Sequence, residues 1–237
     1  MVGANGAGAG ARWLIAISVT TPLAAPAFAG AWTQPAKSSL TIATVAHASV
    51  EDGDMWRTET LTESGFGGGW GMNLKIENEK RFASINDDRT GWRLGIQKSF
   101  ALGDRTSAAI IANYIGGDSF DSSFCQGSGV ETRAALGTSF EFLGREAFVN
   151  AEAGYRTRED QDCERVLGEI AFGMDVTPNL SATVKTWAED GEEGRSAKVE
   201  ASLLYDFGPL SVGLGWREEV SGAFEEKGWL VSAWKSF

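Results

Sequence analysis

The 237-residue chain is poor in several features that mark common classes of protein. It has one histidine and two cysteines, which are too few ligands for a zinc site, and no motif implies a cofactor. After the amino terminus, no stretch approaches the roughly 18 to 20 apolar residues that a membrane helix needs. The formal net charge of −11 disfavours nucleic acid, whose phosphates attract clusters of lysine and arginine. The composition therefore argues against a helical anchor, a metal site and a nucleic-acid partner.

The amino terminus carries the pattern of an export signal. Arg12 precedes a short apolar core at residues 13–19, and Ala27-Phe28-Ala29 forms an A-x-A cleavage site. The apolar core is too short to cross a bilayer. We expect residues 1–29 to be a signal peptide that is removed after Ala29, so that the mature chain is exported.

The rest of the chain consists of short segments in which apolar and polar residues alternate. The chain has 30 glycines and nine tryptophans but only five prolines, and alternation at period two in nearly every segment indicates strands. The segment 55–63 has little apolar surface, so ten strands is the alternative to twelve. The twelve predicted strands are 38–49, 55–63, 70–82, 90–102, 105–116, 129–143, 147–158, 165–176, 180–189, 196–207, 210–218 and 225–237. The predicted tight turns are Gly103-Asp104, Gly144-Arg145-Glu146, Thr177-Pro178-Asn179 and Gly208-Pro209, with a looser turn at 65–69.

The alternation separates an apolar face from a charged face. Trp70 and Leu74 share one face of their segment, whereas Lys75 and Glu77 share the other. Charged side chains are too costly for a dry core but fit a wet lumen, and aromatic residues near the ends of the apolar stripes suit a membrane interface. We therefore predict an all-β fold, a closed antiparallel up-and-down transmembrane β-barrel over residues 38–237. A secreted sandwich or a soluble barrel is the alternative.

The two ends of this region fit such a barrel. An even number of strands puts both ends on the periplasmic side, so residues 30–37 are expected to be a periplasmic segment before the first strand. In the final strand, Trp229, Val231 and Phe237 share one face, and the chain ends on an aromatic residue. The chain thus resembles small, porin-like outer-membrane β-barrel proteins of Gram-negative bacteria.

The start of the mature chain adds to this resemblance. Gly30-Ala31-Trp32-Thr33-Gln34-Pro35 is similar to a segment of alphaproteobacterial barrel proteins of unassigned role. The resemblance implies location in the bacterial outer membrane, contact with its lipid, and insertion by the barrel-assembly machinery with Phe237 as the recognition element. Twelve-stranded families include narrow solute channels and membrane-embedded hydrolases, so the fold leaves the function open.

The predicted lumen lining carries charges of both signs. A pore for acidic sugars would be lined mainly by arginine and lysine, whereas interleaved opposite charges pair across a narrow barrel. The leading hypothesis is a narrow, weakly selective channel for small polar solutes that is not an enzyme. The alternative is a closed structural barrel that presents acidic loops for surface interactions. The lining candidates are Lys75, Glu77, Arg93, Gln97, Glu131, Arg133, Glu152, Arg156, Glu169, Lys185, Glu200 and Arg217, with Glu141, Asp175, Lys198 and Asp206 as further inward candidates.

The two cysteines fall in neighbouring external loops. Cys125 lies in the predicted loop 117–128 and Cys163 in the loop 159–164, one hairpin apart. An exported compartment favours oxidation of thiols. We predict a disulfide that restrains these loops over the mouth of the barrel.

The single histidine raises a third hypothesis. His47 and Ser49 lie two residues apart on one predicted strand and therefore share a face. In an outer-membrane lipid acyl hydrolase, the serine would attack the ester with the histidine as its base. The surrounding motif of those enzymes is missing, and a polar histidine at the barrel rim is the simpler interpretation.

Overall fold

A computed structural model describes residues 30–51, 53–82, 88–118, 125, 127–159, 163–191, 194–222 and 225–237. The predicted signal peptide, residues 1–29, lies outside the described residues. Among the residues that are described, no helix is long and apolar enough to cross a membrane.

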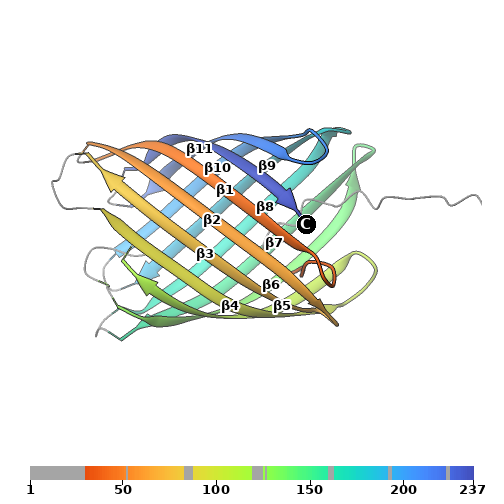
Figure 1. The fold of residues 1–237 in the computed structure, drawn as a ribbon, viewed down its shortest axis with the longest axis horizontal. Helices are drawn as coiled ribbons and strands as arrows, with labels where there is room; N and C mark the ends of the chain where they lie inside the picture. The colour runs from red at the N-terminus through yellow and green to blue at the C-terminus, as the bar shows by residue number, and fades with distance from the viewer. Residues whose placement is uncertain are drawn as a thin grey trace, which may run out of the picture.

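In the described part of the chain, twelve antiparallel strands form a closed barrel (Figure 1). Each strand pairs with its neighbours in sequence, and β12 closes the ring by pairing with β1. The predicted fold class and the count of twelve strands are confirmed, and the ten-strand alternative is wrong. The strands are β1 (Ser39–Val50), β2 (Gly53–Gly67), β3 (Trp70–Arg81), β4 (Arg89–Ala101), β5 (Thr106–Gly117), β6 (Gly129–Phe142), β7 (Arg145–Arg158), β8 (Arg165–Thr177), β9 (Leu180–Gly191), β10 (Gly194–Asp206), β11 (Ser211–Ser221) and β12 (Lys227–Ser236).

The strand that the sequence predicted least clearly, β2, is the longest, with 15 residues. It pairs with both β1 and β3, and it extends into the predicted loose turn at 65–69. Its outward positions include Thr58, Thr60 and Thr62, which are polar but β-branched and so favour the extended backbone. Hydrogen bonding to two neighbours, rather than a continuous apolar face, therefore keeps β2 in the barrel.

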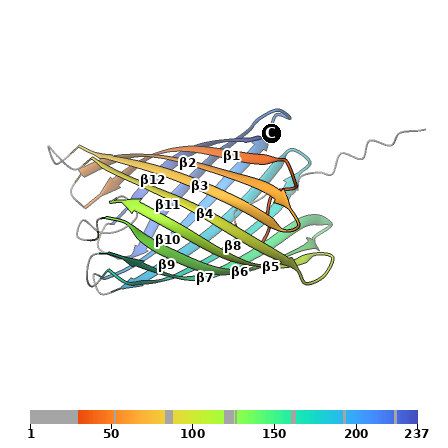
Figure 2. The same ribbon diagram turned by 60° about the horizontal axis from the view of Figure 1, so that its bottom comes forward.

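The connections at one end of the barrel, here called the turn end, have two to four residues (Figure 2). The longest connections, β3–β4, β5–β6 and β7–β8, lie at the other end, here called the loop end, where β1–β2 and β9–β10 are also joined by two residues. The β6–β7 turn consists of Leu143 and Gly144, with φ angles of 52° and 72°. Positive φ at both positions of a two-residue turn matches the twist of the strands that flank it. Arg145 and Glu146, which the sequence predicted in this turn, instead begin β7.

The two ends of the barrel chain meet at the turn end. The amide N of Ser39 donates to the carbonyl O of Phe237 at 3.1 Å, and the amide N of Phe237 donates back at 2.8 Å. This pairing agrees with the even number of strands. It also holds the terminal aromatic residue at the rim.

Apolar side chains face outward and charged side chains face the lumen. Ile96 and Val231 are 57% and 52% exposed, whereas Glu131 and Arg156 are 0% and 3% exposed. A water-soluble barrel would bury the apolar face instead. The distribution is that of a barrel whose outer surface is solvated by lipid.

Aromatic pairs mark both edges of the outward apolar band. Near the loop end, the ring centroids of Trp92 on β4 and Tyr114 on β5 are 5.4 Å apart. Near the turn end, those of Tyr205 and Phe207 are 4.7 Å apart. Aromatic side chains favour the two membrane interfaces, so these pairs delimit the segment that crosses the bilayer.

We expect Ile96→Arg, near the middle of the outward face of β4, to destabilise the barrel by about 2 to 4 kcal/mol, because it places a cation in the hydrocarbon layer. The measurement is urea unfolding in lipid vesicles. Leu143→Arg is the matched control, since Leu143 is 82% exposed in a turn outside the strands. Equal free energies of unfolding for the two variants would contradict the assignment of the apolar face to lipid.

Candidate functional site in the barrel lumen

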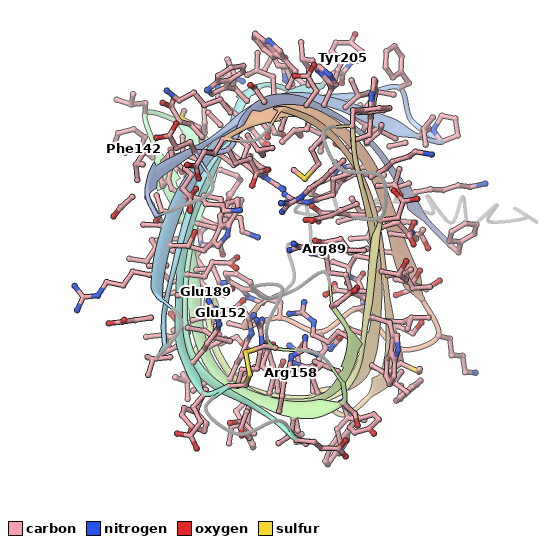
Figure 3. The ribbon with its side chains drawn as sticks, turned by 90° about the vertical axis from the view of Figure 1, so that its left-hand side faces the viewer. Arg89, Phe142, Glu152, Arg158, Glu189 and Tyr205 are labelled. Atoms are coloured by element: carbon pink, nitrogen blue, oxygen red, sulfur yellow. A yellow bond between two sulfur atoms is a disulfide. The ribbon has the colours of Figure 1, made fainter. Side chains whose placement is uncertain are left out.

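A cavity of about 200 Å³, here called the vestibule, occupies the loop end of the lumen. Figure 3 looks into the barrel from this end, with Arg89 and Glu189 inside the ring of strands. Charged side chains of both signs line most of the vestibule. The basic ones are Arg57, Lys75, Arg81, Arg89, Arg93, Arg133, Arg156, Arg165, Lys185, Lys198 and Arg217, and the acidic ones are Glu59, Glu77, Glu79, Glu169, Glu189 and Glu226.

One network of ion pairs is centred on Glu131 of β6, which is fully buried. Its Oε2 accepts from Arg156 Nη2 at 2.7 Å, and its Oε1 accepts from Arg133 Nε at 2.7 Å and from Arg93 Nη1 at 3.1 Å. Arg133 also contacts Glu152 at 3.3 Å. Because three guanidinium groups share Glu131, this carboxylate holds β4, β6 and β7 together inside the lumen.

A second network is centred on Glu226, in the connection between β11 and β12. Arg57 Nη1 donates to Glu226 Oε1 at 2.7 Å, and Lys198 also pairs with this carboxylate. Arg217 links the network to Glu59 at 3.0 Å and to Glu200 at 2.8 Å. The network therefore joins β2, β10 and β11 across β12 and β1.

Glu226 lies outside the membrane-spanning strands. Burial opposes ionisation of its carboxyl group, but Arg57, Lys198 and Arg217 outweigh burial and lower its pKa to about 2. The ordinary pKa is 4.5, so the stability that this carboxylate supplies is present above about pH 4.5 and is lost as the pH falls toward 2.

One aromatic residue stands among these charges. The ring of Trp187 on β9 lies 5.1 Å from the guanidinium carbon of Arg217 and 5.3 Å from Lys185 Nζ. Cations over an indole face are stabilised by its quadrupole. Trp187 thus gives the vestibule a flat surface between two cations.

All twelve residues predicted to line the lumen lie on inward positions. Gln97 and Glu152 line a smaller cavity of about 30 Å³ closer to the turn end, and Glu131 and Glu200 lie in ion pairs behind the vestibule wall. The other eight line the vestibule: Lys75, Glu77, Arg93, Arg133, Arg156, Glu169, Lys185 and Arg217.

Two further inward candidates are corrected. Glu141 and Asp206 alternate with inward residues, but both are exposed because they lie at the turn end of their strands, at the rim. Lys198 lines the vestibule, and Asp175 is half-buried and accepts a hydrogen bond from Ser181 Oγ at 2.8 Å.

The sequence analysis did not single out Arg57, Glu59, Glu79 or Glu226. Arg57 and Glu59 lie two residues apart on β2, the weakly predicted strand, and share a face with Met55. This alternation was the signal in the sequence that could have placed both side chains in the lumen. Glu226 precedes β12, where no alternation indicates a direction.

The turn end of the lumen holds part of the predicted periplasmic segment. Ala31 is fully buried inside the barrel, and its amide N donates to Asn150 Oδ1 at 3.1 Å. Gln97 Nε2 donates to the carbonyl O of Gly30 at 2.7 Å, and Ser107 Oγ donates to that of Ala31 at 2.9 Å. The start of the segment 30–37 is therefore built into the lumen, whereas residues 35–37 are exposed.

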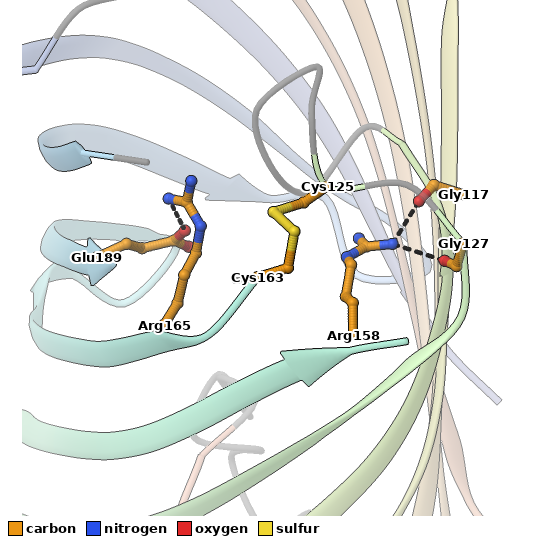
Figure 4. The surroundings of a disulfide bond; sticks show 7 residues. All are labelled: Gly117, Cys125, Gly127, Arg158, Cys163, Arg165 and Glu189. Carbon is orange, nitrogen blue, oxygen red and sulfur yellow. Dashed lines mark hydrogen bonds and ion pairs between the residues drawn. A yellow bond between two sulfur atoms is a disulfide. The ribbon is translucent and has the colours of Figure 1, made fainter. Parts of the chain in front are cut away.

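The predicted disulfide is present at the loop end (Figure 4). Cys125 and Cys163 are bonded, with their Cα atoms 5.6 Å apart, and both are buried. Beside them, Arg158 Nη1 donates to the carbonyl O atoms of Gly117 and Gly127 at 2.5 and 2.7 Å. The bond and these hydrogen bonds fasten the β5–β6 and β7–β8 connections to each other.

His47 and Ser49 share a face of β1, as predicted, but this face is the outer one. Both side chains are exposed, and the ring of His47 packs against Trp56 with centroids 4.8 Å apart. Within the described residues, neither side chain forms a hydrogen bond. The geometry gives the hydrolase hypothesis no contact between base and nucleophile.

Several solved structures share this fold at low sequence identity. The KdgM porin aligns with a TM-score of 0.57 and 10% identity over 83% of this chain and 99% of its own. The NanC porin aligns with a TM-score of 0.57 and 10% identity over 82% and 98%. An outer-membrane channel from Pseudomonas putida F1 aligns with a TM-score of 0.56 and 8% identity over 89% and 99%.

The chain therefore has the fold of small outer-membrane porins and channels, and its outward apolar band places it in the outer membrane. No protein-family model matches the chain, and no curated protein matches its sequence.

We expect Glu131→Gln to lower the free energy of unfolding by about 3 to 5 kcal/mol, because buried Arg156 and half-buried Arg93 and Arg133 lose their shared carboxylate. Urea unfolding in lipid vesicles measures the change. Glu141→Gln, the same substitution on the exposed end of β6, should change stability by no more than about 0.5 kcal/mol. Equal effects of the two substitutions would show that the Glu131 network contributes no stability.

Proposed function

We propose that this barrel is a narrow, weakly selective passage for small polar solutes across the outer membrane. The observation that carries the proposal is the vestibule, a cavity at the loop end whose wall is mostly charged. Such a wall replaces part of the hydration shell of a polar solute, which an apolar constriction cannot do.

The charge balance supports weak selectivity. At its surface the vestibule shows more basic than acidic side chains. Carboxylates directly behind the arginines, including Glu131, Glu152 and Glu200, offset most of this excess. A small anion is therefore favoured over a cation of the same size, but only modestly.

The same balance argues against a long acidic chain as the solute. The KdgM porin has been described in complex with disordered oligogalacturonate, an acidic oligosaccharide. In the present barrel, an extended polyanion would meet Glu59, Glu77, Glu169 and Glu189 along the vestibule wall. Repulsion at these positions favours small solutes instead.

The closed structural barrel remains the competing proposal. It is supported by the two ion-pair networks, which cross the interior, and by the segment built into the turn end of the lumen. The acidic loops are its candidate surface for interactions, although several of their residues lie outside the described ranges.

Single-channel recording on the refolded chain in a planar bilayer distinguishes the two proposals. We expect small steady conductance, with a reversal potential in a salt gradient that indicates slight anion preference. Lys185→Glu should shift this potential toward cation preference, because Lys185 Nζ faces the vestibule and pairs with one carboxylate, Glu169, at 3.0 Å.

Lys80→Glu is the matched control, since Lys80 is exposed on the outer face of β3 and should leave the reversal potential unchanged. If neither the intact chain nor a variant with a weakened amino-terminal segment, such as Trp32→Ala, conducts ions, the proposed channel is overturned and the closed barrel is favoured.

A further inference from the structure

The amino-terminal segment crosses the periplasmic mouth of the lumen. Trp32 reaches β7, where its ring meets that of Phe148 edge to face at 6.4 Å, while Gln34 Nε2 donates to Glu63 Oε2 on β2 at 3.3 Å. These strands stand on nearly opposite walls of the twelve-strand ring. The segment therefore spans the width of the mouth before it bends into β1.

The barrel wall is shaped to receive Trp32. A Cβ atom at Gly137 on β6 would lie 2.3 Å from Trp32 Cη2, so only glycine leaves room for the indole. Gly173 on β8 makes room in the same way for Phe148, which packs against that indole. Two glycines and an aromatic ring thus form a pocket that the segment fills.

The position of Gly30 is equally restricted. A Cβ atom there would lie 2.4 Å from Asn150 Nδ2, and the carbonyl O of Gly30 accepts a hydrogen bond from Gln97. Gly30 also lines the smaller cavity of about 30 Å³, together with Glu63 and Glu152. The first residue of the predicted mature chain therefore shares a small cavity with two carboxylates.

Within the described ranges, Glu63 forms an ion pair with no lysine or arginine. It is only 7% exposed, and its one hydrogen bond within the described residues comes from the uncharged amide of Gln34. Arg93 and Arg133 also line the small cavity, but they are engaged by Glu131, and Arg133 by Glu152 as well. A buried carboxylate without a cation is costly, so this cavity is suited to receive a positive group.

We propose that residues 30–35 form a plug that narrows the periplasmic mouth of the barrel, and that Glu63 and Glu152 bind the ammonium group released at Gly30 when the signal peptide is cleaved. The plug rests on the predicted cleavage after Ala29. Its effect on passage rests on the proposed function, whereas binding of the amino terminus does not.

Labelling of the amino terminus tests the binding directly. The mature chain, beginning at Gly30 and refolded in vesicles, is treated with 2-pyridinecarboxaldehyde, which modifies α-amino groups rather than lysines, and the product is followed by intact mass. Trp32→Ala and Gly137→Leu, which each dislodge the indole, should speed labelling at least about tenfold, since the docked amine loses its charged hydrogen bonds. Glu63→Gln should speed it as well.

Gly168→Leu is the matched control, because nothing lies within 4 Å of a Cβ atom added there. It should label at the rate of the unchanged chain. If all variants label at one rate, the amino terminus is not docked and the plug is overturned. Trp32→Ala leaves the barrel wall intact, so the result does not depend on Gly137→Leu folding.

Conductance tests the second half of the proposal. Trp32→Ala and Gly137→Leu should raise single-channel conductance severalfold over the intact chain, whereas Gly168→Leu should not. Unchanged conductance in open channels would show that the docked segment does not restrict passage. A third outcome separates the two proposals. If the unchanged chain labels slowly and Trp32→Ala labels faster, but no variant conducts, the proposed channel is overturned and the docked amino terminus is supported.

Discussion

The closure of β1 on β12 is the constraint on which the rest of the structure depends. Lipid offers no hydrogen-bonding partner, so every strand of the chain must satisfy its backbone groups with two neighbours. The ring that results leaves no free edge, and even the polar β2 is held because both of its neighbours pair with it. Once the ring is closed, the alternation of side chains gives each strand one face toward lipid and one toward an enclosed space.

That enclosed space determines what the interior can be. Alternate strand positions carry glutamate and arginine, and the ring brings them within hydrogen-bonding distance, as at Glu131. Glu226, in the β11–β12 connection, joins the lumen charges in the same way. Ions taken out of bulk water are tolerated only when they are paired, so the networks follow from the narrowness of the barrel. The same pairing limits free space, and the lumen divides into a charged vestibule and a filled periplasmic mouth. Permeation and rigidity therefore compete for the same side chains.

The sequence predicted those features that repeat at period two. Strand positions, outward Ile96 and inward Glu131 follow from local alternation, and the cysteine pair follows from adjacency of hairpins. Height along the barrel axis does not follow from parity, which is why Glu141 and Asp206 were expected in the lumen but lie at the rim. Parity also shows that His47 and Ser49 share a face without showing that the face is the outer one.

Segments without alternation could not be placed from the sequence. Glu226 turns into the lumen because Arg57 and Lys198 attract it there, and these partners lie on strands far away in the chain. Ala31 can be buried because its backbone groups and the carbonyl O of Gly30 form hydrogen bonds inside the barrel. Their partners are the side chains of Asn150, Gln97 and Ser107. In both cases the decisive contacts come from residues that are distant in the sequence, so no local pattern predicts them.

The bond between Cys125 and Cys163 has a further consequence for the integrity of the molecule. It encloses the whole β6–β7 hairpin in a covalent loop, and the two-residue bend of this hairpin, Leu143-Gly144, is exposed on the opposite side of the membrane. A protease that cut this bend would produce two chains still joined through sulfur. The wall of the barrel would then survive a nick on its periplasmic side as one covalent unit.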